Sequence, residues 1–246
     1  MLKKRWSVIA FVLFFLPIFD AKAIDFMGPP ASVLKQGQCD IGFVYSYSEN
    51  DIKISRHEIS ETIKNVKINR YWANLGYGLA DQWEVNLRLG AADAKADDID
   101  FDGSTDFAWG WNTKLTFASA EKVDWGVLLQ MSWLKTDESY HYDLSEYGLG
   151  TSQKIKFDAY EVQIAAGPTL KMEGWKLYGG PFLYLVKGGL DAKVGGVTHG
   201  FDLEEDSAFG VYAGTEIDLA TNTSLNIEGQ FTGDSWGIGS GILWKF

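Results

Sequence analysis

Cysteine and basic residues are scarce in this chain of 246 residues, and each shortage excludes a class of protein. The single cysteine, Cys39, excludes a disulfide framework and a cysteine-rich metal site. Lys and Arg number 22 against 33 Asp and Glu, and no basic cluster follows the first residues, which excludes the usual nucleic-acid-binding surface. Disordered chains are poor in aromatic residues, whereas this chain is 15% aromatic. The composition therefore indicates a folded, acidic protein of one domain or two small ones.

Only the start of the chain carries a long apolar run. Residues 3–5 are basic, residues 6–19 are apolar apart from one proline and one serine, and residues 21–23 read Ala-Lys-Ala. A positive start, a short apolar run and a small-x-small triplet predict a signal peptide over residues 1–23 that is removed on export. The run is shorter than the roughly 20 residues that a membrane-spanning helix needs, so an uncleaved anchor is the weaker alternative.

From Cys39 onward, apolar residues alternate with polar ones. Trp83, Val85, Leu87 and Leu89, for example, are separated by single polar residues. Such alternation puts successive side chains on opposite faces of a β-strand. Most of the alternating stretches have about the 9–11 residues with which a tilted strand crosses a bilayer. The ten predicted strands cover about 39–49, 63–79, 83–92, 107–117, 123–134, 156–170, 175–187, 207–219, 224–232 and 235–246.

The connections between these strands alternate in length. Those over residues 50–62, 93–106, 135–155 and 188–206 are long, and the ones between them are short. Transmembrane barrels have short periplasmic turns and longer outer loops. The sequence therefore predicts an all-β fold, a transmembrane antiparallel up-and-down β-barrel of about ten strands over residues 39–246, with eight and twelve strands as the alternatives.

The two faces of the predicted strands set their orientation. The polar face is rich in glycine, which weakens a strand unless another group approaches its backbone closely. Eight of the ten Trp fall on the apolar face, most of them near strand ends. This pattern is typical of a lipid-facing band between two aromatic girdles. We expect the apolar face outward and the glycine-rich face inward, with the following large side chains in the lumen: Trp72, Tyr178, Phe182, Tyr184 and Tyr212.

Six charged residues, three of each sign, fall on the inward face at middle depth. Buried charges must be paired, and ten strands lie close to the number whose side chains fill the interior. We expect an ion-pair network that fills the lumen, with a selective water-filled channel as the alternative. The six residues of the expected network are Arg70, Arg88, Lys114, Glu161, Glu216 and Glu228.

Residues 24–38 show no alternation and predict a periplasmic N-terminal extension, with a short plug in the lumen as the alternative.

The end of the chain carries the most specific pattern. Gly241, Trp244 and Phe246 lie in a last strand that ends on an aromatic residue. This resembles the terminal signal of bacterial outer-membrane barrels, which the barrel assembly machinery recognises. The chain as a whole resembles the small outer-membrane barrel proteins of the OmpA, OmpX and OmpW kind, without a periplasmic domain. The resemblance implies a location in the outer membrane, with membrane lipid as neighbour. Acidic stretches such as residues 202–206 suggest contacts with lipopolysaccharide mediated by divalent cations.

A D-x-D-x-D-G pattern lies in the second long connection. It comprises Asp98, Asp100 and Asp102, and Asp106 stands at the ninth position of the pattern. Carboxylates on alternate residues followed by a glycine are typical of calcium loops. The twelfth position is not an acid, and no helical pattern flanks the loop. We expect at most a weak Ca²⁺ site here, with a solvated acidic loop as the alternative, and no other cofactor.

One catalytic alternative rests on a resemblance. Outer-membrane proteases of the omptin family are also ten-stranded and use acidic pairs with a His-Asp pair at the outer mouth. The matching residues here are His141 with Asp143 in the third long connection, and Asp97 with Asp98 in the second. The order of the His-Asp pair and the calcium-like pattern around Asp98 weigh against this alternative. The remaining histidines are His57 and His199.

The expected function is therefore not enzymatic. The sequence predicts a rigid membrane scaffold that displays acidic loops outside the cell and has a largely filled lumen. A narrow porin-like channel for small solutes is the first alternative, and an omptin-like protease is the second. The pattern leaves the oligomeric state open.

Overall fold

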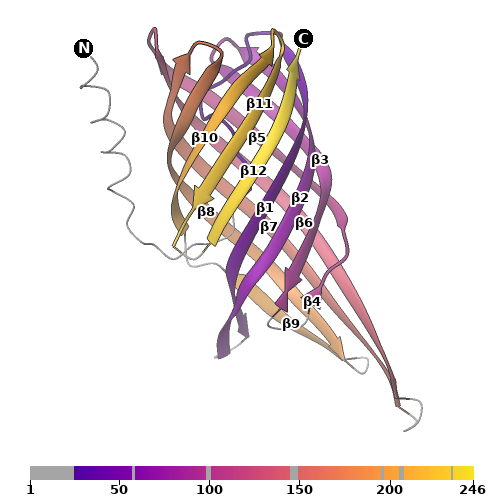
Figure 1. The fold of residues 1–246 in the computed structure, drawn as a ribbon. Helices are drawn as coiled ribbons and strands as arrows, with labels where there is room; N and C mark the ends of the chain where they lie inside the picture. Colours follow the sequence, from indigo (N-terminus) through magenta and orange to yellow (C-terminus); the bar gives the residue numbers. More distant parts are fainter. Residues whose placement is uncertain are drawn as a thin grey trace, which may run out of the picture.

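Ten long strands form a closed antiparallel wall in the computed structural model, as predicted (Figure 1). The structure describes residues 25–56, 59–97, 101–144, 149–194, 197–204, 208–233 and 235–246. The wall strands are β1 (Cys39–Arg56), β2 (Ile59–Ala80), β3 (Trp83–Ala96), β5 (Asp106–Ser119), β6 (Val123–Leu144), β7 (Leu149–Met172), β8 (Trp175–Val194), β10 (Ala208–Ala220), β11 (Thr223–Phe231) and β12 (Ser235–Lys245).

The barrel closes between its first and last strands. β1 pairs with β12 from Asp40↔Lys245 to Asn50↔Ser235, and with β2 on its other side. Two short strands at the end of the barrel opposite the C-terminus, β4 (Phe101–Asp102) and β9 (Val197–Glu204), were not predicted. β4 pairs with β3, and β9 pairs with both β8 and β1. At the end of the barrel opposite the C-terminus, beyond β10, β11 and β12, β9 therefore bridges β8 and β1.

The outward face is apolar on all ten wall strands. Leu183, Phe209 and Trp244 are 53%, 61% and 54% exposed, while the inward Trp72 is fully buried. An apolar surface that encircles the molecule far exceeds the few hundred Å² that a soluble monomer exposes, so lipid or detergent must cover it. The predicted orientation is confirmed. No helix in the described ranges is long and apolar enough to cross a membrane.

The described parts of the long connections are mostly strand, and their prediction as loops is wrong there, while residues 103–105 of the second connection form no strand. β6 and β7 stay paired out to Leu144↔Leu149, and this hairpin reaches farthest from the C-terminal end (Figure 1). The alternation continues beyond the membrane-facing band, but its polarity inverts. Along β6 the outward residue after Trp133 is Lys135, while the inward residue changes from Ser132 to Leu134. Water replaces lipid outside the strand at this level. The predicted strands end there because the prediction required apolar residues on the outward face.

The inverted part of the barrel has an apolar interior, which continues toward the plug because Trp72 and Phe26 belong to the same cluster. Ile68, Leu134, Phe157 and Phe101 are 0% to 5% exposed and belong to one cluster of buried side chains. Full burial of such a side chain contributes about 1.5–3 kcal/mol relative to its exposure. This outer core fills the space between the protruding hairpins.

Quenching by brominated lipid tests the orientation of the wall. In vesicles that contain such lipid, Trp111→Phe is expected to remove part of the quenchable tryptophan fluorescence, because Trp111 lies on the outward face and is 36% exposed. Trp72→Phe is expected to leave the quenchable part unchanged. Equal losses in the two variants would contradict the orientation.

Candidate functional site

Residues 25–34 lie inside the barrel, so the structure contains the second of the two alternatives for this segment, the lumen plug. Asp25, Met27 and Leu34 are 0%, 2% and 1% exposed. Exposure rises at residues 35–37, where the chain turns at the barrel mouth, and Gly37 N donates to Gly78 O at 2.9 Å. The segment therefore enters at the end with the short turns and reaches the middle of the lumen. We call residues 25–34 the plug.

The innermost residue of the plug is held by an ion pair. Arg88 Nη1 lies 2.7 Å from Asp25 Oδ2, and both side chains are buried. Ser46 Oγ and Trp72 Nε1 donate to Asp25 Oδ1 at 2.8 and 3.2 Å. The guanidinium of Arg88 also lies 4.5 Å from the centre of the Trp72 ring. Among the described residues, Asp25 is the carboxylate that pairs with the buried guanidinium of Arg88.

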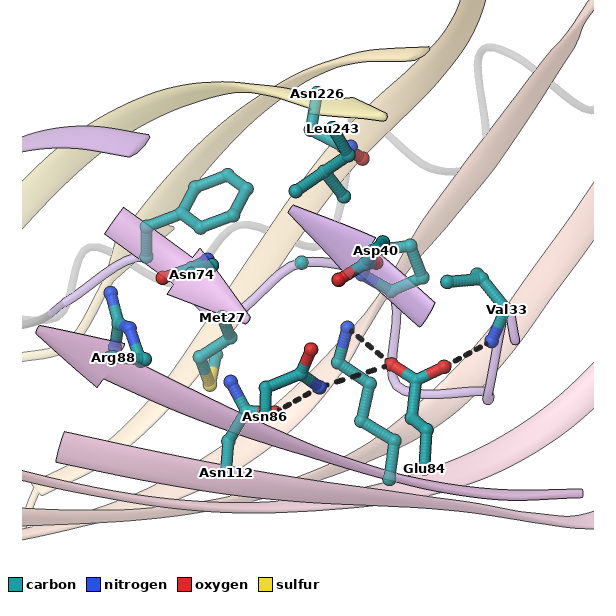
Figure 2. A pocket seen from close by; sticks show the side chains of 14 residues that line it. Met27, Val33, Asp40, Asn74, Glu84, Asn86, Arg88, Asn112, Asn226 and Leu243 are labelled. Carbon is teal, nitrogen blue, oxygen red and sulfur yellow. Dashed lines mark hydrogen bonds and ion pairs between the residues drawn. The ribbon is translucent and has the colours of Figure 1, made fainter. Parts of the chain in front are cut away.

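Two wall carboxylates bind the backbone of the plug. Glu228 accepts hydrogen bonds from Met27 N at 3.0 Å and Gly28 N at 2.9 Å. Glu84 accepts from Val33 N at 2.7 Å and Leu34 N at 3.0 Å. Figure 2 shows Glu84 between Val33 and the wall side chains that it also contacts. Carboxylates that accept from backbone N–H groups form short, strong hydrogen bonds.

Five side-chain amides connect these two carboxylates and form what we call the amide belt. Each amide nitrogen donates to the next amide oxygen, at 2.9, 3.4, 2.9 and 3.2 Å in chain order. The first amide donates to Glu84 and the last to Glu228. Two of the amides also donate to plug carbonyl groups, those of Phe26 and Asp25, at 3.1 and 2.8 Å. The members of the belt are Asn86, Asn112, Gln130, Gln163 and Gln230.

The six charged residues of the predicted network all face the lumen and are buried. Arg70 and Glu161 pair with each other. Arg88 pairs with Asp25, and Lys114 pairs with Glu84 at 3.3 Å. Glu216 pairs with Lys176 at 2.7 Å and with Lys245 at 3.4 Å, while Glu228 binds the plug backbone. Four partners were missed, and they are Asp25, Glu84, Lys176 and Lys245.

Two cavities lie beside the plug. The smaller, of about 20 Å³, has room for one water molecule (Figure 2). It is lined in part by Asp40, Asn74 and Asn226, whose side chains carry polar atoms without a hydrogen-bond partner among the described residues. The larger, of about 230 Å³, opens at the mouth between plug residues 31–34 and the start of β8 at Lys176. The plug therefore fills the middle of the lumen more completely than the mouth.

The aspartate-rich pattern is only partly described. Asp98 and Asp100 lie outside the described residues. Asp102 forms an ion pair with Lys95 at 2.7 Å, and Asp106 accepts from Ser104 Oγ at 3.1 Å. Within the described residues, no group of three or more His, Cys, Asp or Glu side chains could hold a metal ion. The Ca²⁺ site stays a prediction.

The neighbouring Asp97 has its own partner. Lys67 Nζ donates to Asp97 Oδ2 at 2.6 Å, and this hydrogen bond lowers the pKa of the Asp97 carboxyl. Both side chains are at least one-third exposed, so the pair lies on the surface of the protruding part of the barrel.

The residues of the proposed protease pair lie on the β6–β7 hairpin. His141 and Asp143 stand two residues apart on β6, opposite Ser152 and Gly150 of β7. His57 lies outside the described residues.

At the end of the chain, Gly241 faces the lumen, and Trp244 and Phe246 face outward, 54% and 71% exposed. This alternation agrees with the phase expected for the last strand. Recognition of this strand by the assembly machinery stays a prediction.

Neither a protein-family model nor a curated protein sequence matches the chain. Among solved structures, the outer membrane protease OmpT from Escherichia coli matches with a TM-score of 0.50 and 11% identity, over 91% of this chain and 99% of that one. The translocator domain of the autotransporter NalP from Neisseria meningitidis matches with a TM-score of 0.46 and 8% identity, over 87% and 90%. Ail of Yersinia pestis matches with a TM-score of 0.37 and 15% identity, over 86% and 100%.

The similarity to OmpT, at 11% identity, is one of fold. The chain has the fold of bacterial outer-membrane β-barrels, a closed antiparallel barrel of ten strands. A fold of this class is shared by proteins of different activity, so the role of this chain has to be argued from its own residues.

Proposed function

We propose that this protein is a non-enzymatic scaffold of the outer membrane that displays β-hairpins outside the cell and does not conduct solutes. The observation that carries the proposal is that the lumen is filled at two levels. The plug and the amide belt fill its middle, and the outer core fills the part beyond the membrane. A channel needs a continuous water-filled path, and neither level leaves one in the described residues.

The protruding hairpins are suited to display. β6 and β7 extend past the membrane-facing band as one continuous ladder, stiffened by the outer core beneath it. Their outward residues at this level, such as Lys135 and Asp158, are charged and face water. A rigid, charged protrusion on a closed barrel offers a surface for contact with other molecules. This role does not require that the barrel conduct solutes.

Conductance in a planar lipid bilayer tests this proposal. The refolded protein is expected to give no reproducible single-channel steps, whereas a general porin added to the same membrane gives them. Insertion is checked separately, by the resistance of the barrel to protease in vesicles and by its faster migration on gels when unheated. Reproducible steps from inserted protein would overturn the scaffold proposal.

A narrow channel is the alternative, and the polar lining of the middle of the lumen favours it. Without the plug, the amide belt and the charged residues around it would face water, as the wall of an aqueous pore does. Conduction would also require the outer core to open.

A protease is the second alternative, and its residues are His141 and Asp143. Cleavage of peptides by the refolded protein, lost in His141→Ala and in Asp143→Ala, would favour it over both other functions.

The partners we propose follow from the surface of the barrel. The outward apolar band contacts the hydrocarbon of membrane lipid. Outward lysines just beyond that band, Lys135 and Lys187, lie where the phosphates of lipopolysaccharide would be. The last strand, with Trp244 and Phe246 outward, is the part that the barrel assembly machinery would bind.

A further inference from the structure

We propose that the lumen is a binding site for a peptide segment with an acidic residue at its inner end, and that the plug is its ligand. The plug is then held by the contacts it makes, independently of its covalent link to β1. The inference is separate from the proposed function, because a peptide site in the lumen can exist whether or not the barrel conducts.

The first argument is that the wall recognises peptide backbone. Glu228 and Glu84 bind four plug N–H groups, and the amide belt binds two plug carbonyl groups. These two carboxylates are 2% and 1% exposed. A wall that only had to be filled would carry apolar side chains here, since a buried carboxylate is costly unless donors surround it. The wall groups are therefore matched to the backbone N–H and C=O groups of this peptide segment.

The second argument is that one position selects a side chain. Asp25 meets the buried guanidinium of Arg88 and the donors of Ser46 and Trp72. An asparagine has the same shape, but it would leave Arg88 without an anion. The inner end of the site is thus specific for a carboxylate.

The third argument is that the wall is shaped to the plug. A Cβ atom at Gly126 would lie 2.4 Å from Pro30 O and 2.5 Å from Ala31 N. A Cβ atom at Gly239 would lie 2.6 Å from the Phe26 ring. Strand pairing alone does not require these contacts, because it is the plug, and not a neighbouring strand, that fills the space beside both glycines.

The site can be tested by cleaving the backbone between the plug and β1 after the protein has folded. Residues Gln36 and Gly37 are exposed in the turn at the mouth, so a specific protease recognition sequence can be inserted between them. The full chain is folded in detergent micelles, cut, and passed over a size-exclusion column. Mass spectrometry then measures how much of the N-terminal peptide, which carries Gln36 followed by residues of the inserted sequence, stays with the barrel.

We expect the cut peptide to stay bound to the otherwise unchanged protein. In Arg88→Met it is expected to dissociate about a hundredfold faster, because a buried ion pair has lost one partner. Lys95→Met, which removes a surface ion pair far from the plug, is the matched control and is expected to retain the peptide. Loss of the peptide from the cut, still folded protein would overturn the proposal.

A substitution in the plug peptide, with the wall of the barrel unchanged, keeps the test valid if the Arg88 variant does not fold. Labelled synthetic peptides that cover residues 25–36 are added in excess to the cut protein with its wall unchanged. The native peptide is expected to exchange into the barrel, and the peptide with Asp25→Asn is expected to exchange at least about tenfold less. Equal exchange of the two peptides would refute the assigned specificity, and no exchange of either would refute the site.

Discussion

Gly126→Ala is expected to raise the share of molecules whose plug has left the lumen, while the wall of the barrel stays intact. The added methyl group would stand 2.4 Å from a carbonyl oxygen and 2.5 Å from a backbone nitrogen of the plug. These are backbone atoms that cannot rotate away as a side chain can. Overpacking of this kind costs about 1–3 kcal/mol, so the population with the plug undocked should rise roughly tenfold to a hundredfold. The ladder of β6 does not change, because alanine forms the same backbone hydrogen bonds as glycine.

Limited proteolysis followed by mass spectrometry measures this effect. The native protein is expected to protect residues 25–34, and Gly126→Ala is expected to expose them to cleavage. Gly229→Ala is the matched control, because a Cβ atom there has no neighbour closer than 3.6 Å. Equal protection in Gly126→Ala and the native protein would show that the plug adjusts to the added methyl group, and the argument from wall shape would fail.

Asp25→Asn is expected to destabilise the barrel by about 3–5 kcal/mol, because it leaves the guanidinium of Arg88 buried without an anion. The double variant Asp25→Asn with Arg88→Met is expected to recover much of this loss, since it removes the uncompensated charge as well. Urea unfolding in detergent micelles, followed by tryptophan fluorescence, gives the four free energies of unfolding that the cycle needs: those of the native protein, the two single variants and the double variant.

A surface ion pair serves as the control for this cycle. Lys95 and Asp102 lie at a similar distance, 2.7 Å, but both are about half exposed or more. Asp102→Asn is expected to leave the unfolding midpoint nearly unchanged, because water and salt screen such pairs. A small effect of Asp25→Asn, equal to that of Asp102→Asn, would show that the ion pair in the lumen does not hold the structure together.

The predicted pairing of the lumen charges was incomplete for a physical reason. Alternation places Arg88 on the inward face, and burial requires that it be paired. Which anion reaches it depends on the shear of the barrel and on the path of the plug, and Asp25 lies 63 residues away in the sequence. Arg70 and Glu161 were both in the predicted set and pair with each other, 91 residues apart.

The aspartate pattern shows the limit of a local motif. Asp102 has the spacing of a calcium ligand, yet its side chain pairs with Lys95 across the β3–β4 ladder. The pattern can be recognised in the sequence. The sequence does not show that Lys95 is the cross-strand neighbour of Asp102 and competes with a cation for its carboxylate.

The sequence by itself determined the wall of this protein, because a period of two and a lipid-facing apolar phase act on each strand locally. It determined the outward tryptophans and the inward glycines in the same way, whereas the structure decided among eight, ten and twelve strands. Tertiary structure decided what fills the barrel. Residues 25–34 have no periodicity of their own, and they take their shape from carboxylates and amides that lie 50 to 205 residues away. It also decided where the hairpins end, because the solvent outside the strand changes from lipid to water without any break in the alternation.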